Sequence, residues 1–282
     1  MLKKIRIIIA AFFLITVTLL FLDYTGTLHA YIGWCAKMQF VPAILVGNIA
    51  LIAGLILMAL LLGRLYCSVI CPLGIFQDIV SWFAGIRKKN RFSYRPPNKI
   101  FIALRFSLLG IFVLSIVISI NVIMALLEPY SAYGRMVSQI LSPFYLWGNN
   151  ILAFFAERID SYAFYTVDVW FKGAGVFVIA VLTFAGVGIF AWKSGRGYCN
   201  TVCPVGAFFA LLAKCSLIKL RIDKEKCGNC NICVKNCKSG CIDLHVKKID
   251  YLRCVACFNC TDRCPNGAIN YTVPQKQKDI QA

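Results

Sequence analysis

Two copies of one cysteine pattern lie near the C-terminal end of the chain and limit its fold more than any other feature. Both have the spacing Cys-x-x-Cys-x-x-Cys-x-x-x-Cys, and they comprise Cys227, Cys230, Cys233 and Cys237, and Cys254, Cys257, Cys260 and Cys264. Three cysteines at three-residue intervals can surround three corners of a cubane, and the fourth cysteine of each run completes the other cluster. We therefore predict one [4Fe-4S] cluster on Cys227, Cys230, Cys233 and Cys264, and a second on Cys254, Cys257, Cys260 and Cys237.

Zinc is the main alternative for closely spaced cysteines. A zinc site needs only two CxxC pairs, so zinc would leave cysteines over in each run. The runs also belong to an internal repeat, because CGNCNICVKNCKSGCI aligns with CVACFNCTDRCPNGAI position for position. The first copy has Lys238 where the second has Pro265, and Cys241 where the second has Ala268. We interpret Cys241 as a small buried apolar residue, and we expect both departures to change the surroundings of a cluster rather than its ligands.

The rest of the chain has the composition of a membrane protein. Hydrophobic residues make up 60% of it and charged residues only 15%. Four segments satisfy the need of a bilayer-spanning helix for about 20 mostly apolar residues: 5–22, 41–62, 100–126 and 173–192. We therefore predict an α-helical membrane protein, with a four-helix transmembrane domain at 1–213 and a bacterial 2[4Fe-4S] ferredoxin-like domain at 214–282.

Basic residues are distributed unevenly about these four segments. Lys3, Lys4 and Arg6 precede the first, seven Lys or Arg separate the second from the third, and fifteen follow the fourth, whereas residues 23–40 carry only Lys37. Basic residues gather on the cytoplasmic side of short loops. We therefore expect a multi-pass protein of the bacterial inner (cytoplasmic) membrane, with both termini and the ferredoxin-like domain in the cytoplasm.

One further apolar stretch, 138–157, contains Pro143 and Gly148-Asn149-Asn150. A fifth full span there would place the C-terminal domain on the opposite side of the membrane. We interpret 130–172 as an interfacial or re-entrant helix on the outer side, and two short helices that cap the bundle are the alternative.

The formal net charge of +18 could indicate a nucleic-acid-binding protein. Much of this charge is the topology signal described above, and no base-reading motif accompanies it. We therefore expect no nucleic acid among the partners. The excess can instead attract anionic membrane lipid or an acidic redox protein.

A second repeat follows two of the predicted spans, as GRLYCSVICPLGIF at 63–76 and GRGYCNTVCPVGAF at 195–208. Four-residue spacing puts the two thiols of each motif on one helical face, and the proline beside them interrupts backbone hydrogen bonding. Disulfides are disfavoured in a reducing cytoplasm, which leaves structural zinc or a jointly held iron–sulfur cluster. We predict one shared metal site, with a third iron–sulfur cluster as the favoured occupant, on Cys67, Cys71, Cys199 and Cys203.

Taken together, the motifs resemble those of the NapH/MauN group of membrane-bound ferredoxin-type proteins, with relatives among the NosR-type regulators and the cytochrome oxidase accessory ferredoxins. The matching pieces are the twin GRxYCxxxCP motifs, EPYSAYGR at 128–135 and the two cysteine runs of the tail. The resemblance implies four transmembrane helices, two cytoplasmic [4Fe-4S] clusters and electron transfer from quinol toward a partner oxidoreductase. The large extracytoplasmic flavin-binding domain of NosR-type proteins has no counterpart in this sequence, which weakens a regulatory interpretation.

We accordingly predict a membrane-bound iron–sulfur protein that passes electrons between the quinone pool and a redox partner of unknown identity, as a quinol-dehydrogenase-type subunit rather than a stand-alone enzyme. Two alternatives stay open: an accessory or maturation factor that supplies electrons to a metalloenzyme under assembly, and a redox-sensing regulator. His29, Gln39 and Arg105 could hydrogen-bond a quinone, but we favour a structural role for all three. No motif for nucleotide binding, hydrolysis or nucleophilic catalysis occurs, so we predict no catalytic residue.

Overall fold

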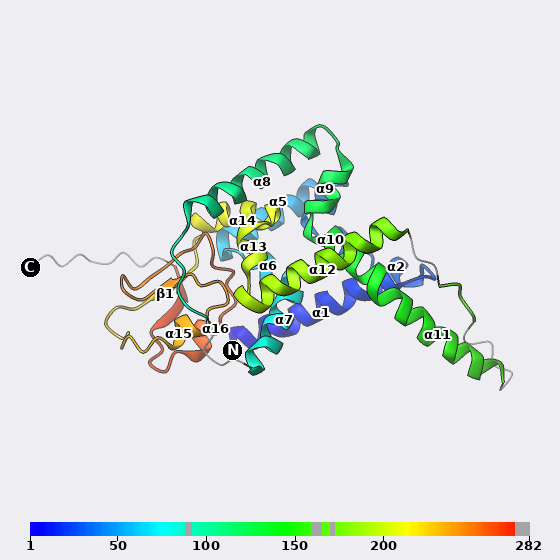
Figure 1. The fold of residues 1–282 in the computed structure, drawn as a ribbon. Coiled ribbons are helices and arrows are strands. Elements are labelled where there is room, and N and C mark those ends of the chain that lie inside the picture. Colours follow the sequence, from blue (N-terminus) through cyan, green and yellow to red (C-terminus); the bar gives the residue numbers. More distant parts are fainter. Residues whose placement is uncertain (88–91, 159–164, 170–172, 274–282) are drawn as a thin grey trace, which may run out of the picture.

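The computed structural model describes residues 1–87, 92–158, 165–169 and 173–273, and helices dominate it (Figure 1). The first half of the chain contains α1 (Leu2–Leu22), α2 (Thr27–Ile32), α3 (Trp34–Lys37), α4 (Phe40–Leu45), α5 (Ile49–Leu62), α6 (Tyr66–Val69), α7 (Pro72–Arg87), α8 (Lys99–Val117) and α9 (Asn121–Leu127). The chain then forms α10 (Pro129–Met136), the π-helical η1 (Val137–Leu141), α11 (Ser142–Glu157), α12 (Ala174–Ser194), α13 (Gly197–Thr201) and α14 (Pro204–Lys214).

Within the described residues, three helices are long and apolar enough to cross a membrane: α1, α8 and α12. The expected single helix over 41–62 is wrong, because Gly47 adopts a φ of 70° and the Asn48 side chain accepts a hydrogen bond from the Leu51 N–H, which caps a new helix. The resulting α5 has 14 residues, and is therefore about 21 Å long against a hydrocarbon core of about 30 Å. The expected helix over 100–126 likewise ends at Val117, before Ser119 with a φ of 61°.

A single apolar core holds the helical domain together. Helix α1 contributes Ala10, Phe13, Val17 and Leu20, which are spaced by three or four residues and therefore lie on one face. Helix α1 packs on α6 and α7, and α7 packs in turn on α12. Large apolar side chains on the outer faces of α8 and α12, such as Val113 and Leu182, stay exposed, as expected of helices that face lipid.

The segment from α10 to α11 is helical throughout, with η1 in its middle. Pro143 does not break it, because Pro143 lies in the first turn of α11, where a proline removes no needed hydrogen bond. Two short capping helices are therefore the wrong interpretation. Helix α10 packs on α7 and α12 with Ala132 and Tyr133 buried, so its part of the segment belongs to the core of the helical domain. The part of 130–172 at 159–164 and 170–172 lies outside the described residues.

The tail forms a small unit of two short antiparallel sheets and two short helices. Strand β1 (Lys219–Ile222) pairs with β4 (Ile269–Thr272), and β2 (Ile242–Asp243) pairs with β3 (Lys248–Ile249). Helices α15 (Ile232–Lys235) and α16 (Asn259–Arg263) each contain the third cysteine of one run. The apolar core of this unit is built from Leu220, Val234, Ile242, Ile249 and Ile269.

The tail unit docks on one end of the helical domain (Figure 1). Lys3 at the start of α1 forms an ion pair of 2.7 Å with Asp262. At the end of α5, the carbonyl of Leu62 accepts a hydrogen bond of 2.7 Å from the Tyr271 hydroxyl. The Arg95 N–H, just before α8, donates to the carbonyl of Gly240. The start of α1, the end of α5 and the start of α8 therefore all lie at the end of the molecule that carries the tail.

Candidate metal centres

The cysteines of the tail gather in two pockets. The first is lined by Cys227, Cys230, Cys233 and Cys264, together with residues of β1 and β4. The second is lined by Cys237, Cys254, Cys257 and Cys260. In each pocket three cysteines come from one run and the fourth from the other. Within the described ranges, no group of three or more His, Cys, Asp or Glu side chains is arranged to hold a single metal ion.

The loops that carry these cysteines share an uncommon backbone. Asn229 and Asn231 in the first run, and Ala256 and Phe258 at the same positions of the second, have φ values of 51°, 60°, 49° and 58°. Left-handed residues in such loops turn successive backbone N–H groups toward a common concavity, which suits an anion such as an iron–sulfur cluster. The two pockets therefore fit clusters in both their thiols and their backbone.

Cys241 lies in the wall of the second pocket. Its Sγ is 3.5 Å from the Sγ of Cys237, and it also interacts with the thiol of Cys254. The Cys241 thiol and the backbone N–H groups of residues 239–241 outweigh burial and lower the pKa of Cys237, which favours the thiolate that a metal requires. Cys241 is buried as expected, but it contacts two of the predicted ligands instead of only filling space.

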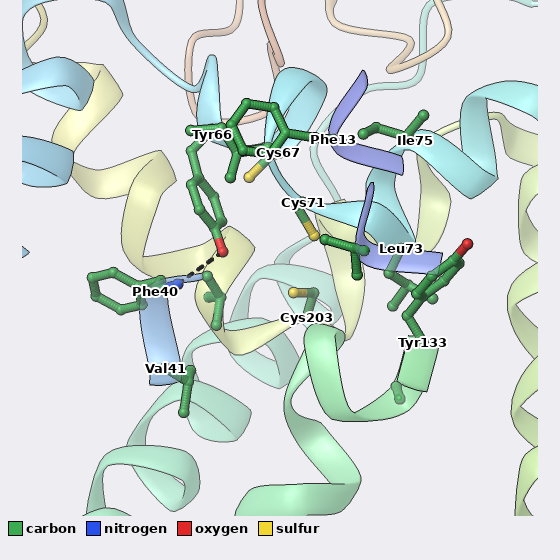
Figure 2. Close-up of a cluster of buried hydrophobic side chains, with 14 of the residues drawn as sticks. Phe13, Phe40, Val41, Tyr66, Cys67, Cys71, Leu73, Ile75, Tyr133 and Cys203 are labelled. Carbon is green, nitrogen blue, oxygen red and sulfur yellow. Dashed lines mark hydrogen bonds between the residues drawn. The ribbon is translucent and has the colours of Figure 1, made fainter. Parts of the chain in front are cut away.

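The cysteines of the CxxxCP motifs are brought together inside the helical domain. Cys67 lies in α6, and Cys71 follows the end of that helix. Cys199 lies in α13, and Cys203 follows its end. The expected continuous helical face is therefore wrong. All four side chains are buried, and Figure 2 shows Cys67, Cys71 and Cys203 within one apolar cluster. Cys199 interacts electrostatically with the other three, so the four thiols lie in one region of the helical domain.

The two motifs hold each other through a reciprocal pair of arginines. Arg64 of the first motif donates to the carbonyl of Cys199 at 3.3 Å, and Arg196 of the second donates to the carbonyl of Cys67 at 2.6 Å. Two glycines leave the space for these contacts. A Cβ on Gly74 would collide with the carbonyl oxygen of Cys67 and crowd Arg196, and a Cβ on Gly206 would do the same to the carbonyl oxygen of Cys199 and to Arg64. The sequence repeat thus produces one site with two similar halves.

Buried positive charge surrounds this site. Arg64 and Arg105 are 1% and 4% exposed, and both donate to the carbonyl of Leu252. Among the ion pairs of the described residues, neither arginine has a carboxylate partner. A buried cation is costly without a nearby anion. Deprotonated thiols at the CxxxCP motifs would supply that anion, so the residues fit a metal centre held by thiolates.

Asp78, which the sequence analysis did not single out, joins the two domains. Its carboxylate pairs with Arg196 at 2.8 Å, with Arg6 at 2.8 Å and with Lys238 at 3.2 Å. Burial alone would raise the pKa of this carboxyl, but the three cations outweigh it and hold the pKa well below its usual range. Lys238 also accepts a hydrogen bond from the Arg196 N–H through its carbonyl. The lysine that replaces proline in the first cysteine run therefore anchors the tail. The one signal in the sequence was an acidic residue shortly after a CxxxCP motif in an apolar segment.

The three candidate quinone ligands lie in different surroundings. His29 is exposed and contacts Asp23 at 3.4 Å. Gln39 is buried, donates to the carbonyl of Ile70 and accepts a hydrogen bond from Tyr66. Arg105 donates to the carbonyls of Leu252 and Gly206, and it lines a cavity between the domains. These contacts give Gln39 a structural role, whereas Arg105 lies where a ligand could approach.

Comparison with known proteins points to one class. A family model described as a 4Fe-4S binding domain matches residues 44–90 and 174–225, which contain the two CxxxCP motifs. The methylamine utilization ferredoxin-type protein MauN of Paracoccus denitrificans is 26% identical over 214 residues, which are 74% of this chain and 57% of that protein. The ferredoxin-type protein NapH of Haemophilus influenzae is 23% identical over 198 residues, 69% of this chain and 55% of that protein.

The putative electron transport protein YccM of Escherichia coli is 25% identical over 201 residues, 70% of this chain and 48% of that protein. The chain thus spans about half the length of the curated relatives it matches. No solved structure matches it. The chain is thus similar to proteins named MauN and NapH ferredoxin-type proteins, and two of its segments match a 4Fe-4S binding domain.

Proposed function

We propose that this relative of the NapH and MauN ferredoxin-type proteins is a membrane-bound subunit that passes electrons between the quinone pool and a partner oxidoreductase. The observation that carries the proposal is the arrangement of twelve cysteines in three sets, two in the tail and one where the helical domain meets it. Three sets at one end of a membrane-capable bundle suit a relay between a lipid-soluble carrier and a soluble protein.

Each tail pocket would hold one [4Fe-4S] cluster. We assign Cys227, Cys230, Cys233 and Cys264 to one, and Cys254, Cys257, Cys260 and Cys237 to the other. The left-handed loop residues support the assignment because a backbone of this kind can present successive N–H groups to an anion. When bound, the clusters supply one-electron redox chemistry at potentials set by hydrogen bonds, charge and exposure.

Cys67, Cys71, Cys199 and Cys203 would hold a third centre, for which an iron–sulfur cluster is the occupant we favour. Two observations support it. The 4Fe-4S family model matches the segments that contain these cysteines. The uncompensated buried charges of Arg64 and Arg105 favour an anionic occupant. Arg196 contacts both regions, because its side chain donates to the carbonyl of Cys67 and its backbone N–H donates to the carbonyl of Lys238 in the tail.

We further propose that the tail and both termini face the cytoplasm of a bacterial inner membrane, with 1–213 as the membrane domain and 214–282 as the ferredoxin-like domain. Four crossings would then require α4 and α5 to act together as the second. The basic starts of α1 and α8 lie at the end of the molecule that carries the tail, which supports this orientation.

Exchange with quinone tests the function directly. Full-length protein in lipid nanodiscs is reduced anaerobically with dithionite, freed of excess reductant and mixed with a soluble quinone analogue, while the visible absorbance of the clusters is followed. We expect the oxidised spectrum to return, because the quinone accepts two electrons and two protons to become quinol. Clusters that accept electrons from dithionite but never exchange with quinone would overturn the proposal and favour the maturation-factor alternative.

A further inference from the structure

A cavity of about 720 Å³ lies where the helical domain meets the tail. One wall is apolar and comes from the membrane-capable helices, with Phe101, Ile102 and Phe106 of α8 and Phe190 of α12. The polar part of the lining, here called the polar wall, includes Asn200, Ser239 and Arg253, and Arg105 of α8 also contributes to it. The cavity is therefore amphipathic, which suits a ligand with an apolar body and a polar head.

The polar wall is built from the neighbours of predicted cluster ligands. Ser239 and Gly240 lie between Cys237 and Cys241, and Leu252 and Arg253 directly precede Cys254. Ser239 lines both this cavity and the second tail pocket, and its buried Oγ has no hydrogen-bond partner. The lining also contains Gly197 and Asn200, which flank Cys199 of the CxxxCP site in the sequence. A ligand in the cavity would thus lie beside two of the three thiol sets.

The cavity also lies at the depth where a lipid-soluble molecule could enter. Helix α8 begins at Lys99, so Arg105 lies about 9 Å farther along its axis at 1.5 Å per residue. Phe101 and Ile102, on the first turns of α8, are 53% and 40% exposed, and they face both the cavity and the surroundings of the helix. The apolar wall therefore continues into the outer, lipid-facing surface of α8.

The lining carries the charged side chains Arg95, Arg105, Arg196, Asp250 and Arg253, and their hydrogen bonds set the chemistry of the head. Arg196 is neutralised by Asp78, and Arg253 is neutralised by Asp250 at 2.6 Å. Arg105 is held by two carbonyl oxygens and carries no carboxylate partner among the described ion pairs. The N–H groups of Arg105 and Arg253 and the unpartnered hydroxyl of Ser239 are hydrogen-bond donors, which suits the carbonyl oxygens of an electron-accepting head. A phospholipid headgroup shares part of that chemistry. Unlike a quinone, however, it cannot exchange electrons with the two neighbouring sets of thiols.

From these observations we propose that the cavity binds the head of a quinone, with its ring against Phe101, Phe106 and Phe190 and its carbonyl oxygens toward the polar wall. The isoprenoid tail leaves along the exposed face of α8. This inference rests on the proposed function and gives the quinone its place beside Ser239 and Asn200.

A cavity-filling substitution tests the site. Ile102→Trp fills the apolar wall, and Leu104→Trp on the same helix, with a similar exposure of 44%, does not line the cavity and is the matched control. Holoprotein in nanodiscs is irradiated with a photoreactive benzoquinone that carries a short alkyl tail, and the labelled peptides are mapped by mass spectrometry. We expect labels on α8 and on 239–253, reduced about tenfold by Ile102→Trp, as for a loss of about 1.4 kcal/mol in binding, and unchanged by Leu104→Trp.

Iron content is measured in every sample and must match that of the wild type. Labels that map elsewhere, or that persist in Ile102→Trp, overturn the site. If the clusters of both variants still exchange electrons with quinone in that case, the proposed function stands without this site. If quinone neither labels nor oxidises the wild-type protein, both the site and the proposed electron exchange with quinone are overturned. Recovery of a bound phospholipid that the quinone analogue does not displace also contradicts the inference.

Discussion

Asp78 balances three cations inside the protein, and its removal should be costly. Asp78→Asn leaves Arg6, Arg196 and Lys238 without their carboxylate, and breaking a buried ion pair on one side costs about 3–5 kcal/mol. We expect a clearly lower thermal unfolding temperature in detergent. Asp262→Asn breaks only the more exposed pair with Lys3 and should change stability by about 0–1 kcal/mol. Equal effects of the two substitutions would contradict the anchoring role.

The same carboxylate predicts a pH dependence. Because the pKa of Asp78 is lower in the folded protein than its ordinary value of 3.8, its contribution is fully present above that pH. The contribution is lost as the pH falls below that value toward the lower, folded pKa. Wild-type stability should therefore drop more steeply in acid than that of Asp78→Asn.

Cys241 offers a test of how the second tail pocket sets its potential. A thiol 3.5 Å from the Sγ of Cys237 can donate to a ligand sulfur and stabilise the more negative, reduced cluster. Removing one hydrogen bond of about 0.5–1.5 kcal/mol corresponds to about 20–60 mV for one electron. We expect Cys241→Ala to keep its iron and to lower the midpoint potential of one cluster by that amount in a redox titration followed by electron paramagnetic resonance.

The exposed Cys215 provides the control for that titration, because it lines neither tail pocket. Cys215→Ala should leave both potentials unchanged. Loss of iron from Cys241→Ala would instead make Cys241 a ligand.

The grouping of cysteines could be predicted from spacing, because a cubane fixes how far apart its ligands stand along the chain. The roles of Asp78 and Lys238 could not be predicted from the sequence. They depend on how the tail docks on the helices, and no local pattern encodes a contact between residues 160 positions apart. Cys241 was interpreted as a small buried apolar residue, whereas its contacts with Cys237 and Cys254 arise from the turn that follows Cys237.

At the scale of elements, the CxxxCP site depends on two glycines that admit the arginine of the opposite motif. Gly74→Ala and Gly206→Ala each place a methyl group against a carbonyl oxygen and an arginine. Overpacking of this kind costs about 1–3 kcal/mol. We expect a lower unfolding temperature and partial loss of iron for both.

Gly85→Ala is the matched control in α7, because nothing lies within 4 Å of its Cβ position. In a helix this change should be neutral or stabilising by about 0.4–1 kcal/mol. If Gly74→Ala behaved like Gly85→Ala, the close approach of the two motifs would be wrong.

The helices illustrate where hydropathy stops being informative. The stretches 41–62 and 100–126 are apolar throughout, but the backbone at Gly47 and at Ser119 divides them. The stretch 138–157 contains residues that usually break helices, but Pro143 occupies a first-turn position and the helix continues. Hydropathy reports burial in an apolar phase, whereas the ends of helices depend on single residues and on packing.

At the scale of the whole molecule, the docking of the tail beside the starts of α1 and α8 predicts one orientation. Reporter fusions at the C-terminus and in α11 should give opposite answers, with the C-terminus in the cytoplasm. A fusion after α1, within 23–26, should agree with α11. If all three reporters lay on one side, the bundle would not cross the membrane as proposed.

Three separate iron–sulfur sites in one chain are the central proposal, and iron counting tests them most directly. Anaerobically purified full-length protein should contain about twelve iron atoms, and Cys199→Ser should contain about eight, because only the site shared by the CxxxCP motifs loses a ligand. Cys67→Ser should give the same result as Cys199→Ser, since both thiols belong to that site. A wild-type protein with about eight iron atoms, unchanged in both variants, would contradict the shared centre.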